Sequence, residues 1–196
     1  MTTAEIDAYL AAAPEKWRPA LLLSVTCALR IGEVIALQAQ DLDLEAGTLT
    51  LRATVAKVNV SQGNRKRVLQ APKAAGARRT VHILLPRTLP RLRKWRSGLG
   101  ELAPGALLFP DSFGGPMDDD VLRRAHKKAA EAIGRPELRN HDLRSTGATL
   151  SAQAGATVRE IQEQLGHTTP AQALRYQTAT AERDAERAKR VSKAWG

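Results

Sequence analysis

Apolar residues at helical spacing mark the beginning of the chain. Thr2 followed by Glu5 is the sequence signature of a capping box and predicts a helix that starts at the N-terminus. The run 17–29 is apolar on most sides, so we expect a buried helix there. The segment 30–33, Arg-Ile-Gly-Glu, should interrupt this helix before a short helical stretch at 34–37.

Between residues 47 and 85 the pattern changes to alternating and β-branched residues. The segment 48–51 reads Thr-Leu-Thr-Leu, valines follow at 55, 58 and 60, and a further apolar stretch spans 81–84. This texture predicts a small antiparallel β-sheet. The polar and basic segment 61–67 and the segment 71–79, rich in small residues and cations, are expected to be turns between its strands.

Helical signals resume after this region. The whole pattern predicts a mainly α fold with a small antiparallel β-sheet, in one compact domain because no seam divides the apolar residues. The further helices are expected over about 87–99, after the aspartates at 118–120, between the Thr157–Glu160 capping box and Gly166, from Thr169-Pro170 onward, and over 181–195.

The charge of the chain indicates a class of partner. Lys and Arg number 30 against 20 Asp and Glu, and the resulting net charge of +10 favours nucleic acid. Only 4% of the residues are aromatic, which argues for phosphate contacts to a duplex over stacking on single strands. No apolar run approaches the roughly 20 residues that span a bilayer, and the single cysteine, Cys27, allows no intrachain disulfide. We therefore expect a cytoplasmic, nucleoid-associated protein that binds no membrane.

Three separated segments carry candidate chemistry. Each has an ordinary structural explanation, because an arginine can cap a helix end, a histidine and an arginine three apart can form a solvated helical pair, and a histidine after a glycine can end a helix. The segments are Arg30 with Gly32 and Glu33, His141 with Arg144, and Leu165-Gly166-His167 followed by Tyr176. Among other candidates, Tyr9 is expected in the core, and His82 and His126 lack matching partners.

In this order and at these intervals, the segments resemble the signature of the tyrosine recombinases of the phage integrase family. That signature has an arginine in a Leu-Arg-x-Gly-Glu stretch, a His-x-x-Arg, a Leu-Gly-His and a tyrosine nine residues later. The resemblance also includes the Pro-Lys turn at 72–73 and the Leu-Arg-Tyr at 174–176, and it covers nearly all of the chain. It implies the catalytic domain of an enzyme that cuts and rejoins duplex DNA through a 3′-phosphotyrosine, without metal, cofactor or ATP.

The resemblance assigns a role to each matching residue. Arg30 and Arg144 match the family's phosphate-binding arginines, and His167 matches a third donor to the same phosphate. Two guanidinium groups can neutralise the non-bridging oxygens of a phosphodiester, as a metal ion does elsewhere. Tyr176 corresponds to the nucleophile. A phenol, with a pKa of about 10, needs help to lose its proton at neutral pH, and His141 corresponds to the family's candidate for that help.

The departing 5′ oxygen needs a proton, and Lys73 matches the family's lysine in the turn between the second and third strands. Neighbouring arginines lower the pKa of a lysine, which makes it a better acid. A solvated surface lysine is the alternative, and Lys57 and Lys66 are competitors on the same sheet. Glu33 is expected to support Arg30 as a hydrogen-bond acceptor and not to act as a base, since its charge would repel a phosphate.

The sequence departs from the family pattern in places. Ala28 stands where glycine is frequent, and Ser145 stands where a second histidine commonly follows the His-x-x-Arg. The family generally carries an N-terminal helical domain that closes a clamp around DNA, and this chain begins where the catalytic domain would. We therefore expect 1–196 to be a single catalytic domain without the N-terminal core-binding domain, either a fragment or a naturally short member.

Two surfaces are candidates for contacts outside the catalytic centre. The helix after residue 120 carries a basic face that should meet the DNA backbone, with an ordinary solvated helix as the equal alternative. In the resembling family the segment after the nucleophile commonly docks on a neighbouring subunit, which implies such docking for 181–196 within a tetramer on DNA; packing on its own domain is the alternative. The basic face consists of Arg123, Arg124, Lys127 and Lys128.

Three other functions fit parts of the sequence. A DNA-binding domain of the same fold that lacks productive catalysis is the main alternative, and the six filled catalytic-type positions disfavour it. A metal-dependent nuclease would need ligand spacing that is missing near His141 and His167. A type IB topoisomerase shares the chemistry, but the short contiguous domain resembles an integrase more closely.

Overall fold

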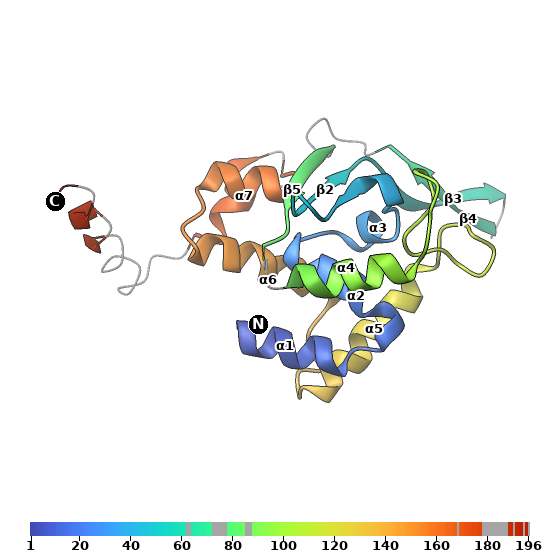
Figure 1. Cartoon of the computed structure of the whole chain (residues 1–196), viewed down its shortest axis with the longest axis horizontal. Helices are drawn as coiled ribbons and strands as arrows, with labels where there is room; N and C mark the ends of the chain where they lie inside the picture. Colours follow the sequence, from blue (N-terminus) through green and yellow to red (C-terminus); the bar gives the residue numbers. More distant parts are fainter. Residues whose placement is uncertain are drawn as a thin grey trace.

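The computed structural model places helices against one side of two small sheets, with the β3–β4 hairpin extending at one end and α6 and α7 at the other (Figure 1). The described residues are 1–61, 64–71, 78–84, 88–167, 169–177, 188–189, 191–193 and 195. The helices are α1 (Thr3–Ala12), α2 (Arg18–Thr26), α3 (Ile31–Val34), α4 (Leu89–Gly98), α5 (Asp119–Ala132), α6 (Asn140–Gln153), α7 (Val158–Leu165) and α8 (Pro170–Leu174), with 3-10 turns at Glu15–Trp17 and Ala39–Asp41. The strands are β1 (Leu42–Asp43), β2 (Thr48–Leu51), β3 (Thr54–Ser61), β4 (Asn64–Gln70) and β5 (Arg79–His82). The mainly α class with antiparallel strands is as predicted.

The N-terminal helix forms where its capping signature predicted. The Thr2 hydroxyl accepts a hydrogen bond from the Glu5 amide, and the Glu5 carboxylate accepts one from the Thr2 amide, so both residues of the capping box are used. The helix buries Ile6, Tyr9 and Leu10. Tyr9 is therefore a core residue, as expected.

The break after the second helix lies elsewhere than predicted. α2 ends at Thr26, and Arg30 caps the N-terminus of α3, so the segment 30–33 begins the short helix and does not interrupt the long one. Ala28 makes the break with a φ of +53°, in the left-handed region that a residue with a Cβ rarely adopts. A glycine, frequent at this position in the resembling family, would adopt this conformation without strain.

The strands form two antiparallel sheets where one was predicted. One sheet has the order β1-β2-β5, and the other is the hairpin β3-β4. The predicted turn at 61–67 is wrong, because Arg65, Lys66 and Arg67 pair in register with residues 57–59 of β3. The hairpin packs on α3 through β3 but extends beyond the body of the domain (Figure 1) and is only partly buried, so its strands accept polar residues that suggested a turn. Arg79 likewise begins β5 and is not part of the predicted turn 71–79, of which 72–77 lie outside the described residues.

Two hydrophobic clusters form the interior. The larger one joins α1, α2, α5 and the three-stranded sheet. The smaller one lies between α6, α7 and α8 and contains Ala28, Ala148, Ala152, Ile161, Leu165 and Ala173, with Tyr176 packed against it. None of the helices among the described residues has the length and apolar character needed to cross a membrane. The candidate catalytic residues that the structure describes lie where the two clusters meet.

Candidate active site

Three arginines surround the buried carboxylate of Glu33, in the first turn of α3. Arg30 donates to it from the backbone amide at 2.8 Å and from Nη1 at 3.0 Å. Arg79 donates through Nη1 at 3.1 Å and Nη2 at 3.2 Å, and Arg144 Nη1 lies 3.8 Å away. Burial alone raises the pKa of Glu33, but the charge and hydrogen bonds of Arg79, the hydrogen bond from the Arg30 amide and the charge of Arg144 together outweigh it and hold the pKa below its usual value. The four side chains carry a net charge of +2, three arginines minus one glutamate.

Arg144 is the most enclosed of these arginines, with 1% of its side chain exposed. It lies on α6, and it donates through Nη1 to the Ala28 carbonyl at 2.7 Å and through Nη2 to the Leu165 carbonyl. Burial, reinforced by the charge of Arg30, lowers its pKa to about 10, so the guanidinium stays charged at neutral pH. Arg144 therefore brings a fixed positive charge to the junction of α2, α6 and α7.

The turn that carries His167 forms as its signals predicted. Thr157 and Glu160 make the capping box of α7, and Gly166 ends the helix in the left-handed conformation, with a φ of +60°. Burial, followed by the charges of Arg144 and Arg30, lowers the pKa of His167 to about 4. The ring is thus neutral at neutral pH, and its buried Nδ1 has no hydrogen-bond partner among the described residues.

Tyr176 reaches the same place from α8. Pro170 starts this helix, and the break between α7 and α8 lets the two residues converge despite their nine-residue separation. The rings of His167 and Tyr176 lie nearly parallel, at 22°, with centroids 6.4 Å apart. Gln177 donates to the Ala156 carbonyl at 2.6 Å and ties the residue after the tyrosine to the start of α7. The predicted convergence of the Leu-Gly-His and the tyrosine is therefore present.

His141 and Lys73 complete the predicted set. His141 is exposed in the first turn of α6, three residues and so about one helical turn before Arg144. It therefore lies close to the arginine cluster. Lys73 lies outside the described residues.

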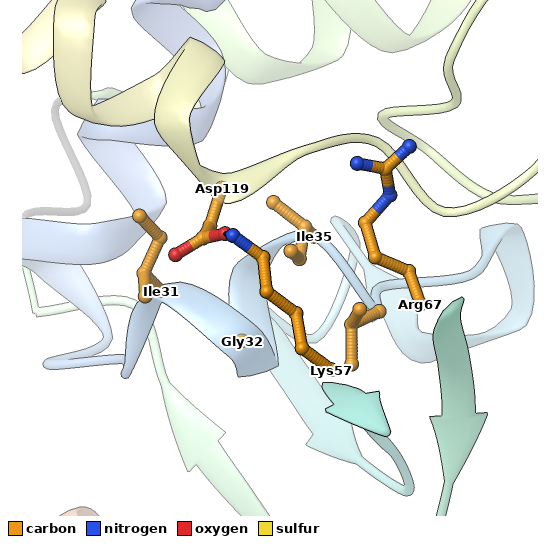
Figure 2. A pocket seen from close by; sticks show the side chains of 7 residues that line it. Ile31, Gly32, Ile35, Lys57, Arg67 and Asp119 are labelled. Atoms are coloured by element: carbon orange, nitrogen blue, oxygen red, sulfur yellow. Dashed lines mark ion pairs between the residues drawn. The ribbon is translucent and has the colours of Figure 1, made fainter. Parts of the chain in front are cut away.

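The two competitors for the lysine role lie on the hairpin. Lys57 Nζ is 2.8 Å from Asp119 and 3.3 Å from Asp118, at the edge of a hollow of about 280 Å³ beneath the hairpin that Ile31, Gly32 and Ile35 also line (Figure 2). The hydrogen bonds to Asp119 and Asp118 raise the pKa of Lys57, which makes it a weaker acid. Lys66 is exposed and pairs in register with Val58.

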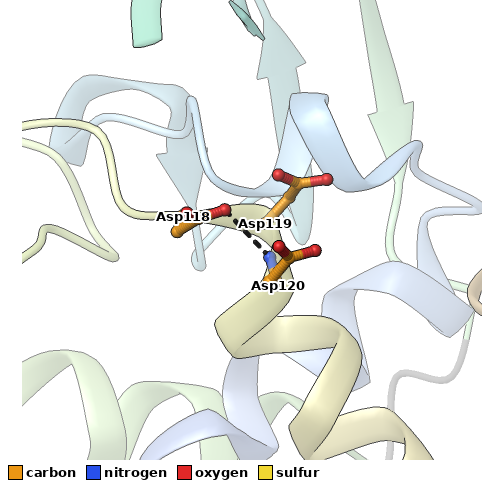
Figure 3. Close-up of side chains that lie close together, drawn as sticks. All are labelled: Asp118, Asp119 and Asp120. Carbon is orange, nitrogen blue, oxygen red and sulfur yellow. Dashed lines mark hydrogen bonds between the residues drawn. The ribbon is translucent and has the colours of Figure 1, made fainter. Parts of the chain in front are cut away.

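One cluster of carboxylates stands out among the described residues. Asp118, Asp119 and Asp120 gather at the N-terminus of α5, where the Asp118 side chain accepts the Asp120 amide and caps the helix (Figure 3). Lys57 and Arg67 pair with Asp118, and Lys57 also pairs with Asp119. The cluster therefore caps α5 and binds the hairpin to it.

The predicted basic face forms on the exposed side of α5, away from the arginine cluster. Arg123 pairs with Asp119 at 3.0 Å, and Lys127 lies 3.7 Å from Glu131. Arg124 and Lys128 make no ion pair with any residue that the structure describes. Because α5 packs on α1, α2 and α3, this face is separate from the site on α7 and α8 (Figure 1).

Sequence reasoning gave Arg79 no role, although it belongs to the buried cluster. The signal was available in the alternation of its strand. Arg79, Val81 and Ile83 point to one side, and the two apolar residues are buried, so period-2 spacing places the arginine on the core face.

Comparisons with known proteins identify the family of the chain. A profile of the phage integrase family matches residues 1–183. The integrase of Mycobacterium phage D29 is 35% identical over 198 residues, which cover 100% of this chain and 52% of that protein. The tyrosine recombinase XerC of Bifidobacterium longum strain DJO10A is 28% identical over 164 residues, covering 83% of this chain and 43% of XerC. The chain spans about half the length of the curated relatives it matches.

Solved structures share the fold. The Tn1549 transposon integrase in complex with transposon right end DNA superposes with a TM-score of 0.73 at 18% identity, covering 98% of this chain and 65% of that chain. XerA recombinase gives a TM-score of 0.71 at 20% identity, covering 97% of this chain and 64% of that chain. At these identities the similarity concerns the fold alone. With a family profile matching most of its length, this chain belongs to the phage integrase family.

Proposed function

We propose that the chain is the catalytic domain of a tyrosine-type site-specific recombinase, which cuts and rejoins duplex DNA through a 3′-phosphotyrosine. One observation carries the proposal. Arg30, Arg144, His167 and Tyr176 come from separate segments, yet the arginines share Glu33 and the histidine stacks beside the tyrosine. The sequence similarity to the integrase of Mycobacterium phage D29 supports the same activity.

The net positive charge of the arginine cluster favours an anionic ligand. Guanidinium groups offer planar donors that match the non-bridging oxygens of a phosphodiester. Arg30 is 46% exposed and can turn toward DNA, whereas Arg144 is fixed by two backbone carbonyls. The two arginines would bind a phosphate held between them more strongly as negative charge develops on its oxygens in the transition state.

The proposed reaction balances without an outside energy source. The Tyr176 oxygen attacks phosphorus, the bond to the 5′ oxygen breaks, and a 3′-phosphotyrosine forms while the 5′ hydroxyl leaves. His141 would take the phenolic proton, and Lys73 would supply the proton to the leaving oxygen. Rejoining reverses these steps with another 5′ hydroxyl, so the phosphodiester bond energy is conserved in the protein–DNA linkage and no ATP is consumed.

His167 would act as a neutral hydrogen-bond donor. Its lowered pKa keeps one N–H and no charge on the ring at neutral pH. A neutral donor can stabilise the phosphate oxygens without competing electrostatically with the arginines beside it. Glu33 would hold the arginines in place and take no proton.

The substrate and assembly follow from the same proposal. Duplex DNA would be the partner, at the nucleoid, and a tetramer would form on it, with 181–196 docking on a neighbouring subunit. Of that segment the structure describes six residues, and Val191 and Trp195 are exposed there. Exposed apolar side chains in this segment support a role in contact with another surface.

A nicked DNA half-site tests the proposal. Its short fragment diffuses away after cleavage, so any covalent protein–DNA adduct is trapped and runs as a larger band on a denaturing gel. We expect an adduct with the unaltered chain, in the presence of EDTA, and none with Tyr176→Phe, which should still bind DNA. Binding without any adduct would favour a DNA-binding domain without catalysis, and strict dependence on a divalent ion would favour a nuclease.

A further inference from the structure

Arg79 uses every nitrogen of its guanidinium group on the protein. Its side chain is 7% exposed at the start of β5. Nη1 and Nη2 bind the two carboxylate oxygens of Glu33, and Nε donates to the Gln164 carbonyl at 2.9 Å. A guanidinium so occupied has little freedom to bind a phosphate itself. Its action on the reaction must therefore pass through the groups that it holds.

The Gln164 carbonyl is at the end of α7. Helix ends leave carbonyl groups without intrahelical partners and carry partial negative charge, which cations stabilise. Arg79 binds the carbonyl of Gln164 and Arg144 that of Leu165, so two arginines hold consecutive carbonyls just before the Gly166-His167 turn. The orientation of that turn is therefore set by the two guanidinium groups.

These bonds also cross the boundary between the hydrophobic clusters. α7 and Tyr176 belong to the smaller cluster, whereas α3, with Glu33 in its first turn, packs in the larger one. Arg79 spans both, because Glu33 is held at one side of its guanidinium and the end of α7 at the other. The smaller cluster is rich in alanine, whose short side chain buries little apolar surface. Apolar packing alone therefore holds α7 only weakly against the rest of the domain.

We propose that Arg79 is a positioning residue for DNA cleavage, which fixes the distance of His167 from Arg30 by joining the Gln164 carbonyl to the Glu33 carboxylate. This inference rests on the proposed recombinase function. Lysine at this position would keep the charge but has a single nitrogen, and it cannot hold the carboxylate through two nitrogens and the carbonyl through a third. A displacement of about 1 Å at a reacting group can slow a reaction by about 100-fold.

The test compares Arg79→Lys with Arg78→Lys, an exposed neighbour that undergoes the same chemical change. On the nicked half-site at saturating protein, Arg79→Lys should form adduct about 10- to 100-fold more slowly, with DNA affinity unchanged, while Arg78→Lys matches the unaltered chain. An Arg79→Lys protein that cleaves at the normal rate would overturn the inference. Failure of the unaltered chain to form adduct would instead overturn the proposed function.

Two further measurements separate positioning from loss of fold. In a His167→Ala background, Arg79→Lys should slow adduct formation by no more than about threefold, because the group that it positions is gone. Undiminished slowing there would contradict action through His167. Amide hydrogen exchange on the free Arg79→Lys protein should accelerate at residues 164–167 and stay unchanged in β2, independently of activity. Uniform acceleration would show general destabilisation and reject the local role.

Discussion

Gly147 of α6 lies so close to Val25 of α2 that a Cβ on the glycine would be 2.2 Å from the Val25 carbonyl oxygen. Because that obstacle is backbone, Gly147→Ala must push the two helices apart, and α6 carries Arg144. We expect a loss of about 1–3 kcal/mol in the free energy of unfolding, measured by urea titration, and slower adduct formation. Gly98→Ala at the end of α4 is the control: nothing lies within 4 Å of its Cβ, and it should be neutral or stabilising.

Glu33→Gln should destabilise the fold more than a usual charge removal. The change leaves three arginines near one another without their shared carboxylate, and breaking a buried pair in this way costs about 3–5 kcal/mol. Chemical denaturation measures the loss. The matched control is Glu45→Gln, whose exposed pair with Arg93 should contribute less than about 1 kcal/mol. Equal effects of the two changes would contradict a structural role for the buried carboxylate.

Stability should decrease with acid through His126. Its Nε2 lies 2.9 Å from the Leu138 carbonyl, which can only accept, so Nε2 carries a proton; in the neutral ring that burial favours, Nδ1 then accepts the Tyr9 hydroxyl at 2.8 Å. Burial lowers the pKa of His126, so the unfolded chain binds this proton more readily than the folded one. The contribution of the neutral His126 ring to the free energy of unfolding is therefore complete above about pH 6.5, and it is lost as the pH falls below that value.

Urea midpoints measured from pH 8 to pH 5 test this dependence. His126→Gln should flatten the decline, leaving the part due to His167, whose pKa is also lowered. His82→Asn, on an exposed residue of β5, should leave the curve unchanged. A decline that His126→Gln does not alter would assign the acid sensitivity to other groups.

The basic face of α5 offers an internal comparison. Arg124 and Lys128 lack carboxylate partners among the described residues, whereas Arg123 and Lys127 are already paired. We expect Arg124→Glu with Lys128→Glu to weaken DNA binding and to reduce the slope of log affinity against log salt by about 2. Fluorescence anisotropy at several salt concentrations gives both values. An unaltered slope would identify the face as an ordinary solvated one.

Lys73→Ala tests the proton donor directly. It should cleave ordinary DNA poorly but recover on a substrate whose leaving 5′ oxygen is replaced by sulfur, because a thiolate departs without a proton. Lys57→Ala is the control and should cleave both substrates normally, since Lys57 is engaged by Asp118 and Asp119. If Lys73→Ala were equally impaired on both substrates, the role would pass to Lys66.

Local sequence signals predicted the helices that carry the site, whereas features that depend on long-range contacts could not be predicted from them. The capping box of α7, the stop at Gly166 and the start at Pro170 were visible because each depends on residues within one turn. The left-handed Ala28 was missed, since alanine itself does not indicate a positive φ; the glycine that is frequent at this position in the family was the available signal. The hairpin strands were partly missed as well, because their polar residues pair across a sheet that lies outside the main core.

The candidate site divides in the same way. Proximity of His167 and Tyr176 followed from motif spacing and the break between their helices. The joint hold of Arg79 and Arg144 on α7 did not, because backbone carbonyls that accept long-range hydrogen bonds leave no mark in a sequence.

The burial of Arg144 has a consequence for mutagenesis. Arg144 joins its own helix, α6, to the Ala28 and Leu165 carbonyls and also supplies the charge proposed for the phosphate. Its removal would therefore alter both the packing of these segments and the electrostatics of the site. Arg30, exposed and bound to one carboxylate, can be replaced with far less disturbance. The two arginines thus share a proposed role in binding the phosphate, but their variants answer different questions. An inactive Arg30 variant would report on catalysis. An inactive Arg144 variant would report first on whether α6 still packs against the Ala28 and Leu165 segments.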